Sequence, residues 1–126
     1  MGLICCRLIL DTNVAIAILK AYSSAIALLA TEQLEFENCA ISQITRMELL
    51  SYPNLEAEEE QTIQNLLANL LVLKLDEKIE QEAIAFRRNH NVKLPHAIIA
   101  ATAKVYGLRL LTLDRQLQAK FSTDLP

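Results

Sequence analysis

The stretch LICCRLILDTN, residues 3–13, begins with an apolar run that stops at Asp11 and Thr12. A short, almost wholly apolar run with branched side chains is typical of a strand that is covered on both faces, as strands of parallel sheets are. Asp11 and Thr12 can cap a helix that starts near Asn13. The stretch therefore predicts a buried strand at 3–10 that leads directly into a helix.

The same succession of apolar strand, polar cap and helix recurs along the chain. Further strands are predicted at 39–41, 71–75 and 108–113, and helices at 13–31 with a break near Ser23 and Ser24, from Ser42 to Pro53, at 56–69, from Asp76 through Phe86, at 96–106 and after Asp114. Pro95 is predicted to be the first residue of its helix, and Gly107 the positive-φ residue that ends it. The segment 89–93 is predicted to be a loop in which His90 is solvated.

Strands that alternate with helices predict an α/β architecture. The sequence has no Asn-Gly or Asp-Gly hairpin signal, so we expect a mostly parallel sheet of four or five strands with helices on both faces. A length of 126 residues with 52% apolar residues predicts a single domain over 1–126. In such sheets ligands bind outside the carboxyl ends of the strands, so residues that follow strands are the candidates for function.

Charge and cysteine content exclude several classes of protein. A net charge of −3 argues against a protein that coats nucleic acid nonspecifically. Residues 64–126 nevertheless carry nine basic and six acidic side chains, so a polyanion could meet a local basic surface there. Three cysteines, two of them adjacent, suggest no disulfide framework and favour a reducing cytoplasm. No apolar run approaches the roughly 20 residues of a membrane span, so we expect no membrane association.

Three carboxylates are the strongest candidates for chemistry. Asp11 and Asp114 each follow a predicted strand, so a parallel sheet would bring both to the same edge. Glu48 is surrounded by apolar residues on its helix, where an ionised carboxylate is costly unless it is paired or bound to a metal. Together they would offer hard oxygen ligands to Mg²⁺ or Mn²⁺. The alternatives are that each Asp only caps a helix and that Glu48 forms an ion pair with Arg46 or another base.

Four pieces of the sequence together resemble one known family. They are Leu-Asp-Thr-Asn at 10–13, Arg-Met-Glu-Leu at 46–49, Lys-Leu-Pro-His-Ala-Ile-Ile-Ala-Ala-Thr-Ala at 93–103 and Leu-Thr-Leu-Asp at 111–114. In this order and over nearly the whole chain they resemble a PIN domain, in particular the VapC-type toxins of toxin-antitoxin systems. The resemblance implies a Rossmann-like fold, a Mg²⁺- or Mn²⁺-dependent endoribonuclease, frequent homodimerisation, and a small antitoxin protein that blocks the site.

The resemblance also implies roles for individual residues. The matching positions are Asp11, Glu48 and Asp114 for the acidic metal ligands, and Thr12 or Asn13 together with Thr112 for the side chains that support them by hydrogen bonds. Arg87 and Lys93 flank the approach to the helix at 96–106, and we expect them to hold RNA phosphates without reading sequence.

His96 departs from the family pattern, because Leu-Pro-His-Ala stands where the family has Leu-Pro-Asp-Ala. One negatively charged oxygen ligand is thereby missing, and affinity for Mg²⁺ should fall because Mg²⁺ prefers oxygen. Imidazole suits Mn²⁺ better than Mg²⁺ and suits zinc better still. His96 therefore predicts weakened activity, an altered metal preference, or a role as general acid or base.

Two alternatives to an active metal-dependent ribonuclease remain from the sequence. The first is a PIN-fold protein that has lost catalysis through His96 and still binds RNA or an antitoxin. The second is a small nucleotide-binding or phospho-acceptor α/β domain in which Asp11 is an ordinary carboxylate at a strand end. The only glycines are Gly2 and Gly107, so the glycine-rich phosphate loop that a nucleotide-binding domain needs is missing.

Overall fold

The computed structural model describes residues 6–20 and 36–124. Its elements are β1 (Leu8–Leu10), α1 (Thr12–Leu19), the 3₁₀ turn η1 (Phe36–Asn38), β2 (Cys39–Ser42), α3 (Gln43–Leu50), α4 (Ala57–Leu67), β3 (Leu71–Leu73), α5 (Glu77–His90), α6 (Leu94–Tyr106), β4 (Arg109–Leu111) and α7 (Arg115–Asp124). In the described part of the chain, none of these helices is long and apolar enough to cross a bilayer.

The four strands pair in the order β3-β2-β1-β4, and all three pairings are parallel. The register places Leu10 of β1 opposite Leu111 of β4. These pairings confirm the predicted α/β architecture, with four strands among the described residues. The chain runs outward from β1 through β2 to β3 and then returns to place β4 on the other side of β1. The order therefore changes direction between β1 and β4, and such a switch opens a crevice at the carboxyl ends of the strands.

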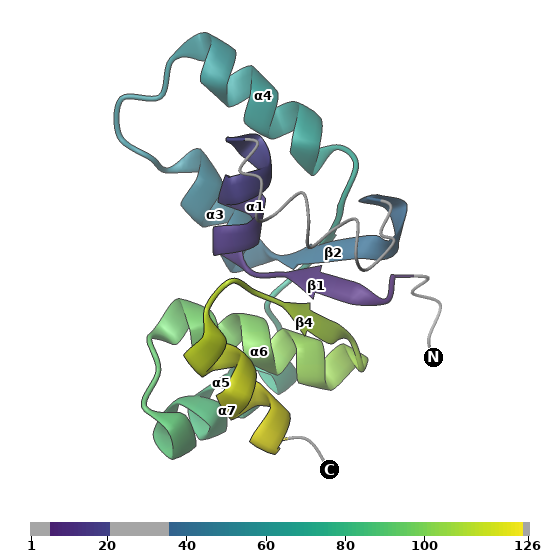
Figure 1. Cartoon of the computed structure of the whole chain (residues 1–126), viewed down its shortest axis with the longest axis vertical. Coiled ribbons are helices and arrows are strands. Elements are labelled where there is room, and N and C mark those ends of the chain that lie inside the picture. The colour runs from purple at the N-terminus through teal and green to yellow at the C-terminus, as the bar shows by residue number, and fades with distance from the viewer. Residues whose placement is uncertain (1–5, 21–35, 125–126) are drawn as a thin grey trace.

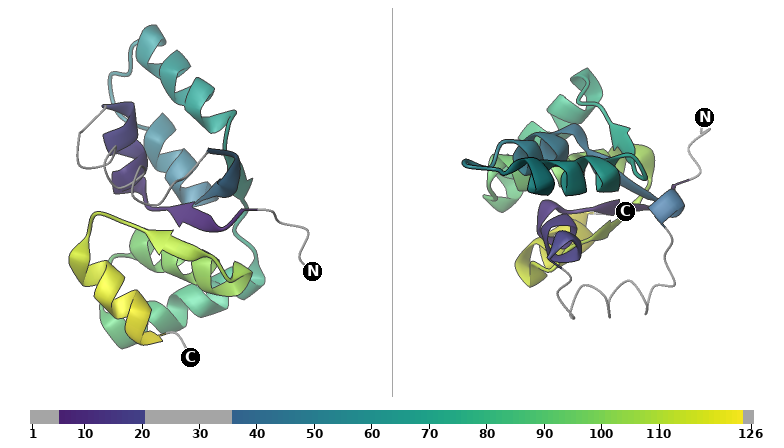
Figure 2. Two further views of the ribbon diagram at one scale, coloured as in Figure 1. Left: turned by 45° about the vertical axis from the view of Figure 1, so that its right-hand side comes forward. Right: turned by 90° about the horizontal axis from the view of Figure 1, so that it is seen from above.

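Side chains of each strand alternate between two apolar clusters. Ile9, Ala40 and Leu110 join one cluster with residues of α5, α6 and α7. Leu8 and Leu10 join a second cluster with residues of α1, α3 and α4. In Figure 1, α1, α3 and α4 lie above the strands and α5, α6 and α7 lie below them, and the left view of Figure 2 shows the same separation. The prediction of helices on both faces is therefore confirmed.

Local capping explains where several helices begin and end. Ser42 Oγ accepts a hydrogen bond from Ile44 N at 3.2 Å, and Asp76 Oδ1 accepts one from Ile79 N at 2.8 Å. Both side chains satisfy amide groups that a helix start leaves without partners. Gly107 has φ 68°, as predicted for the residue that ends α6. Asp11 is the N-cap residue of α1 and accepts from the amide of Thr12, which places a carboxylate at the end of β1.

Several predicted boundaries were wrong. The strand predicted at 108–113 is confined to Arg109–Leu111, the length over which β1 pairs with it, and the strand predicted at 71–75 ends at Leu73. Pro95 is the second residue of α6, because the helix already begins at Leu94. Helix α5 continues through His90 into the predicted loop and ends at Asn91, which has φ 53°. The predictions for 3–5 and 21–31 lie outside the described residues.

Candidate functional site

Asp11 is a fully buried carboxylate at the carboxyl end of β1. Its Oδ1 accepts a hydrogen bond from Thr12 N at 2.9 Å, and its Oδ2 accepts from Asn13 Nδ2 at 3.1 Å and from Thr112 Oγ1 at 2.7 Å. An ionised carboxylate without contact to water is costly, and hydrogen bonds to the charged form offset that cost. The surroundings of Asp11 are thus built to hold a negative charge away from bulk solvent.

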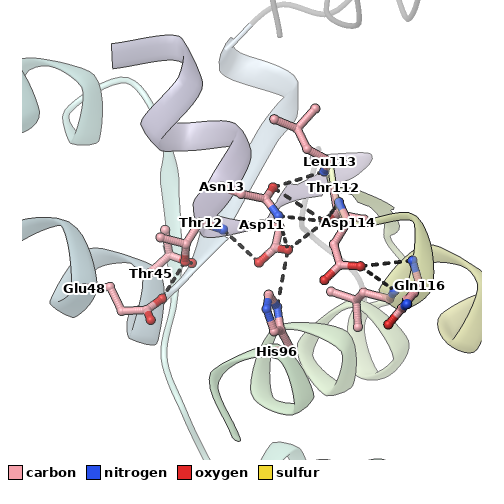
Figure 3. Close-up of polar contacts among 11 residues, drawn as sticks. Asp11, Thr12, Asn13, Thr45, Glu48, His96, Thr112, Leu113, Asp114 and Gln116 are labelled. Atoms are coloured by element: carbon pink, nitrogen blue, oxygen red, sulfur yellow. Dashed lines mark hydrogen bonds and ion pairs between the residues drawn. The ribbon is translucent and has the colours of Figure 1, made fainter. Parts of the chain in front are cut away.

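Asn13 and Thr112 connect the ends of β1 and β4. The Asn13 amide donates to Asp11 and its Oδ1 accepts from the backbone of Leu113 at 3.1 Å, while Thr112 Oγ1 accepts from Asp114 N at 3.0 Å (Figure 3). The hydroxyl group of Thr112 has one hydrogen and two acceptors within reach. It donates to Asp11 Oδ2 at 2.7 Å, because the other acceptor, Asn13 Oδ1, is farther away at 3.5 Å. The two residues predicted to support the carboxylates therefore lie in contact with Asp11.

Glu48 lies on α3 and reaches the site through Thr12. Thr12 Oγ1 donates to Glu48 Oε1 at 2.6 Å and lies 2.9 Å from Thr45 Oγ1. Thr45 is fully buried, so its hydroxyl supports Thr12 from inside the protein. An ion pair of Glu48 with Arg46 or another base, the alternative, is not among the ion pairs of the described residues. Residues two apart on a helix point to different sides, which separates that pair.

Thr45 was missed by the sequence analysis. It stands three residues before Glu48 on the same helix, a spacing that places two side chains on one face. That spacing was visible in the sequence. Its partner Thr12 comes from a different element, and only the packing of α1 against α3 brings the hydroxyls together.

Asp114 caps α7 on the other side of Asp11. Its Oδ1 accepts hydrogen bonds from Gln116 N at 3.0 Å and from Leu117 N at 3.1 Å. Its own backbone amide is held by Thr112. Asp114 therefore caps a helix through Oδ1, which was the alternative considered from the sequence. These capping bonds do not involve its second carboxylate oxygen.

His96 lies beneath Asp11, on the first turn of α6. Its Nδ1 is 3.4 Å from Asp11 Oδ2, and the side chain is 29% exposed. Although this distance qualifies as an ion-pair contact, the Nδ1 atom is buried and makes no hydrogen bond. A hydrogen bond weakens steeply when its angle is poor, so proximity alone does not join Nδ1 to this carboxylate oxygen. Nδ1 is therefore a buried nitrogen that lies beside a carboxylate but has no hydrogen-bond partner.

Two small cavities meet at His96. Asp11, Glu48 and His96 line the first, of about 180 Å³, together with Thr12, Lys93, Pro95 and Ile99. Asp114 and Lys120 line the second, of about 230 Å³, which shares Lys93 and His96 with the first. Figure 3 shows Glu48 and Asp114 on opposite sides of Asp11. Across residues 6–20 and 36–124, no three His, Cys, Asp or Glu side chains approach closely enough to count as a preformed metal site.

The two basic residues predicted to hold phosphates are placed differently. Lys93 is the residue at the N-cap position of α6, makes no capping bond with its side chain, and lines both cavities. Arg87 lies in a separate surface hollow with Ile84, Arg88, Asn91 and Leu94, and its Nε donates to the carbonyl of Val92 at 3.3 Å. The structure thus brings Lys93, but not Arg87, to the carboxylates.

His90 belongs to a polar cluster away from these cavities, so its prediction as a solvated loop residue was wrong. Its Nε2 lies 3.1 Å from Asp124 Oδ1, and its ring centroid lies 4.4 Å from that of Phe86. Partial burial would raise the pKa of Asp124, but hydrogen bonds from His90 and Lys104 outweigh it and lower that pKa. The same contact with Asp124 raises the pKa of Lys104. This cluster fastens the end of α7 to α5 and α6.

Comparison with known proteins confirms the resemblance seen in the sequence. The model of the PIN domain matches residues 8–121. A toxin-antitoxin complex from Klebsiella pneumoniae is similar at 30% identity and a TM-score of 0.74, with 86% of this chain and 87% of that chain covered. No curated protein matches this chain.

Two further solved structures share the fold at lower identity. The VapBC-1 structure from nontypeable Haemophilus influenzae has 23% identity and a TM-score of 0.74, with 94% of both chains covered. The DNA-bound VapBC structure from Salmonella typhimurium has 22% identity and a TM-score of 0.73, with 90% of this chain and 91% of that chain covered. With the family model matched over most of its length, the chain belongs to the PIN domain family.

Proposed function

We propose that this chain is a metal-dependent endoribonuclease that hydrolyses RNA phosphodiester bonds and acts as the toxin of a toxin-antitoxin pair. PIN domains are generally nucleases, and the similar Klebsiella pneumoniae structure is a toxin-antitoxin complex. The observation that carries the proposal is the fully buried carboxylate of Asp11, which lines a cavity with Glu48 at the carboxyl end of β1. A buried negative charge in a cavity is suited to hold a cation.

The donor atoms around this cavity fit a divalent metal ion. Asp11 and Glu48 supply carboxylate oxygens, Asp114 supplies a further carboxylate next to His96, and the buried Nδ1 of His96 lacks a hydrogen bond. We assign Asp11, Glu48 and Asp114 as the ligands of Mg²⁺ or Mn²⁺. When bound, the ion would polarise the phosphodiester and lower the pKa of the attacking water.

The other side chains would hold these groups and the RNA. Asn13 and Thr112 fix Asp11 by hydrogen bonds, and Thr12 fixes Glu48. Such outer contacts orient ligands and are typically worth 10–100-fold in metal affinity or activity. Lys93 lines both cavities, where its positive charge would hold an RNA phosphate. Arg87 would contact the strand farther along the surface.

Substitution of two helix-capping aspartates tests the proposal. Asp11→Asn removes the charge but keeps a good capping side chain, and Asp76→Asn makes the same change at the start of α5. With a mixed RNA substrate and Mg²⁺ or Mn²⁺, we expect wild type and Asp76→Asn to cleave and Asp11→Asn to lose cleavage. Cleavage by Asp11→Asn at the wild-type rate would contradict the proposal, as would cleavage of DNA alone.

We further propose that residues 1–126 form one cytoplasmic domain that binds a small antitoxin protein and forms a homodimer. The match to the PIN domain over 8–121 and the toxin-antitoxin complexes among the similar structures support this part. Ile84 and Leu94, which are 43% and 50% exposed, line the surface hollow beside Arg87 and offer apolar area to a second chain. Light scattering in solution tests the homodimer, and a monomer at micromolar concentration would contradict it.

A further inference from the structure

The buried Nδ1 of His96 makes no hydrogen bond, although Asp11 Oδ2 lies 3.4 Å away. Within the described residues it is the one buried side-chain nitrogen or oxygen without a hydrogen bond. Leaving a buried polar atom unsatisfied costs about 1–3 kcal/mol. An atom of this kind calls for an explanation, and an ion that occupies the site in the working protein is one.

The position of Nδ1 relative to Asp11 suits two ligands of one metal ion. The atoms Nδ1 and Asp11 Oδ2 are 3.4 Å apart and are poorly aligned for a hydrogen bond. Two ligand atoms that each lie about 2.1 Å from a tetrahedral ion are about 3.4 Å apart. For an octahedral ion with the same bond lengths the separation is about 3.0 Å. The observed separation therefore suits tetrahedral coordination without movement of either side chain.

The chemistry of the donors points the same way. Mg²⁺ prefers an octahedron of oxygens, whereas an imidazole nitrogen suits zinc and other transition metals. Asp11, Glu48 and His96 line one cavity but do not form a preformed cluster, so Glu48 would have to move toward the ion to complete three protein ligands and leave the fourth position to water.

We propose that the cavity lined by Asp11, Glu48 and His96 selects a divalent transition metal that accepts nitrogen and tetrahedral coordination, with Zn²⁺ preferred over Mg²⁺. The inference rests on the proposed function only in placing a metal at this cavity. It makes His96 the residue that sets which metal binds. Asn13 and Thr112 already hold Asp11 Oδ2, so one ligand is oriented before the ion arrives.

Metal binding without RNA tests this preference. Binding of Zn²⁺ and of Mg²⁺ to the full chain is measured by calorimetry for wild type, His96→Asp, His96→Ala and His90→Gln. His90→Gln is the matched control, because His90 also faces a carboxylate, that of Asp124 at 3.1 Å, outside the cavity. A background with Cys5→Ser and Cys6→Ser removes thiols that could bind zinc elsewhere. The third cysteine, Cys39, is buried and is a poor zinc ligand, because burial and the nearby Cys6 raise its pKa to about 11.

We expect Zn²⁺ affinity to fall about tenfold or more in both His96 variants and to stay unchanged in His90→Gln. Mg²⁺ affinity should rise in His96→Asp, which restores an oxygen ligand. Co²⁺ in place of Zn²⁺ should give the intense visible absorption of a tetrahedral ion in wild type only.

Equal Zn²⁺ affinity in wild type and His96→Ala would overturn the inference, as would loss of binding in His90→Gln instead. Failure to bind Zn²⁺ would overturn it too and would leave His96 as a counterion of Asp11. A chain that cleaves RNA with Mg²⁺ but shows no zinc preference contradicts this inference alone. A chain that binds zinc through His96 but never cleaves RNA contradicts only the proposed function.

Discussion

Replacing Thr112 by valine removes one hydroxyl at the centre of the contacts between β1 and β4. That hydroxyl donates to the buried carboxylate of Asp11 at 2.7 Å and accepts from the amide of Asp114 at 3.0 Å. A hydrogen bond to a charged group contributes about 1.5–3 kcal/mol and a neutral one about 1 kcal/mol. Since valine keeps the shape and water can replace part of the loss, we expect the free energy of unfolding to fall by about 2–3 kcal/mol.

Urea unfolding followed by circular dichroism measures this change. The slope of the free energy of unfolding against urea concentration should be the same in variant and wild type, because the surface exposed on unfolding is unchanged. Thr62→Val is the matched control: Thr62 lies exposed on α4 and its hydroxyl bonds only its own helix at Glu58 O, 3.0 Å away. We expect that control to stay within about 0.5 kcal/mol of wild type.

A double-mutant cycle locates the effect. If the loss comes from the contact with Asp11, Thr112→Val and Asp11→Asn should be non-additive by about 1 kcal/mol or more. A Thr112→Val chain as stable as Thr62→Val would refute the reasoning, because the carboxylate of Asp11 would then not depend on this hydroxyl.

Three further predictions follow from other contacts. Asp124→Asn should lower the free energy of unfolding by about 1 kcal/mol at pH 7, because its carboxylate contacts His90 and Lys104 at 3.1 Å each. Because folding lowers the pKa of Asp124, its contribution to stability is complete above the ordinary pKa of 3.8 and is lost as the pH falls through the pKa of the folded state, so denaturation curves of variant and wild type should converge in acid; a constant difference would contradict this. Gly107→Ala should cost about 1 kcal/mol in thermal unfolding, because φ is 68° although no atom lies within 4 Å of an added Cβ; an unchanged melting temperature would show that the strain is relieved. Thr45→Val should reduce RNA cleavage by about tenfold or more, because Thr12, which donates to Glu48, loses its contact with the hydroxyl of Thr45. Thr45→Ser keeps that hydroxyl and should retain cleavage; equal loss of cleavage in both variants would contradict a role for the hydroxyl.

The arrangement of the elements could be predicted because the apolar pattern of each strand is local. The strand around Leu10 and the strand around Leu110 both read as covered on two faces, and parallel pairing then places Asp11 and Asp114 at one edge. The predicted strand ends were wrong where pairing with another strand determines the end of the strand. The ladder of β4 ends at Leu111 because β1 ends at Leu10, and no residue of β4 alone carries that information.

Contacts between distant side chains account for what the sequence did not predict. His90 stands among polar neighbours and looks like a loop residue, but Phe86 and Asp124 hold it in a helix. Thr45 is an ordinary helical threonine until α1 packs against α3. The departure at His96 was visible in the sequence, whereas the missing hydrogen bond of its Nδ1 required coordinates.

The contacts between Asp11 and Thr112 and between Asn13 and Leu113 join residues 101 and 100 positions apart. Contacts of such long sequence separation form late in folding, since a large loop must close first. During synthesis, Asp11 leaves the ribosome early and waits for β4 before its carboxylate is held in place. Under the proposed function, a partly made chain carries no assembled site, and the cell that makes it is exposed to the nuclease only after the residues that follow β4 have been translated.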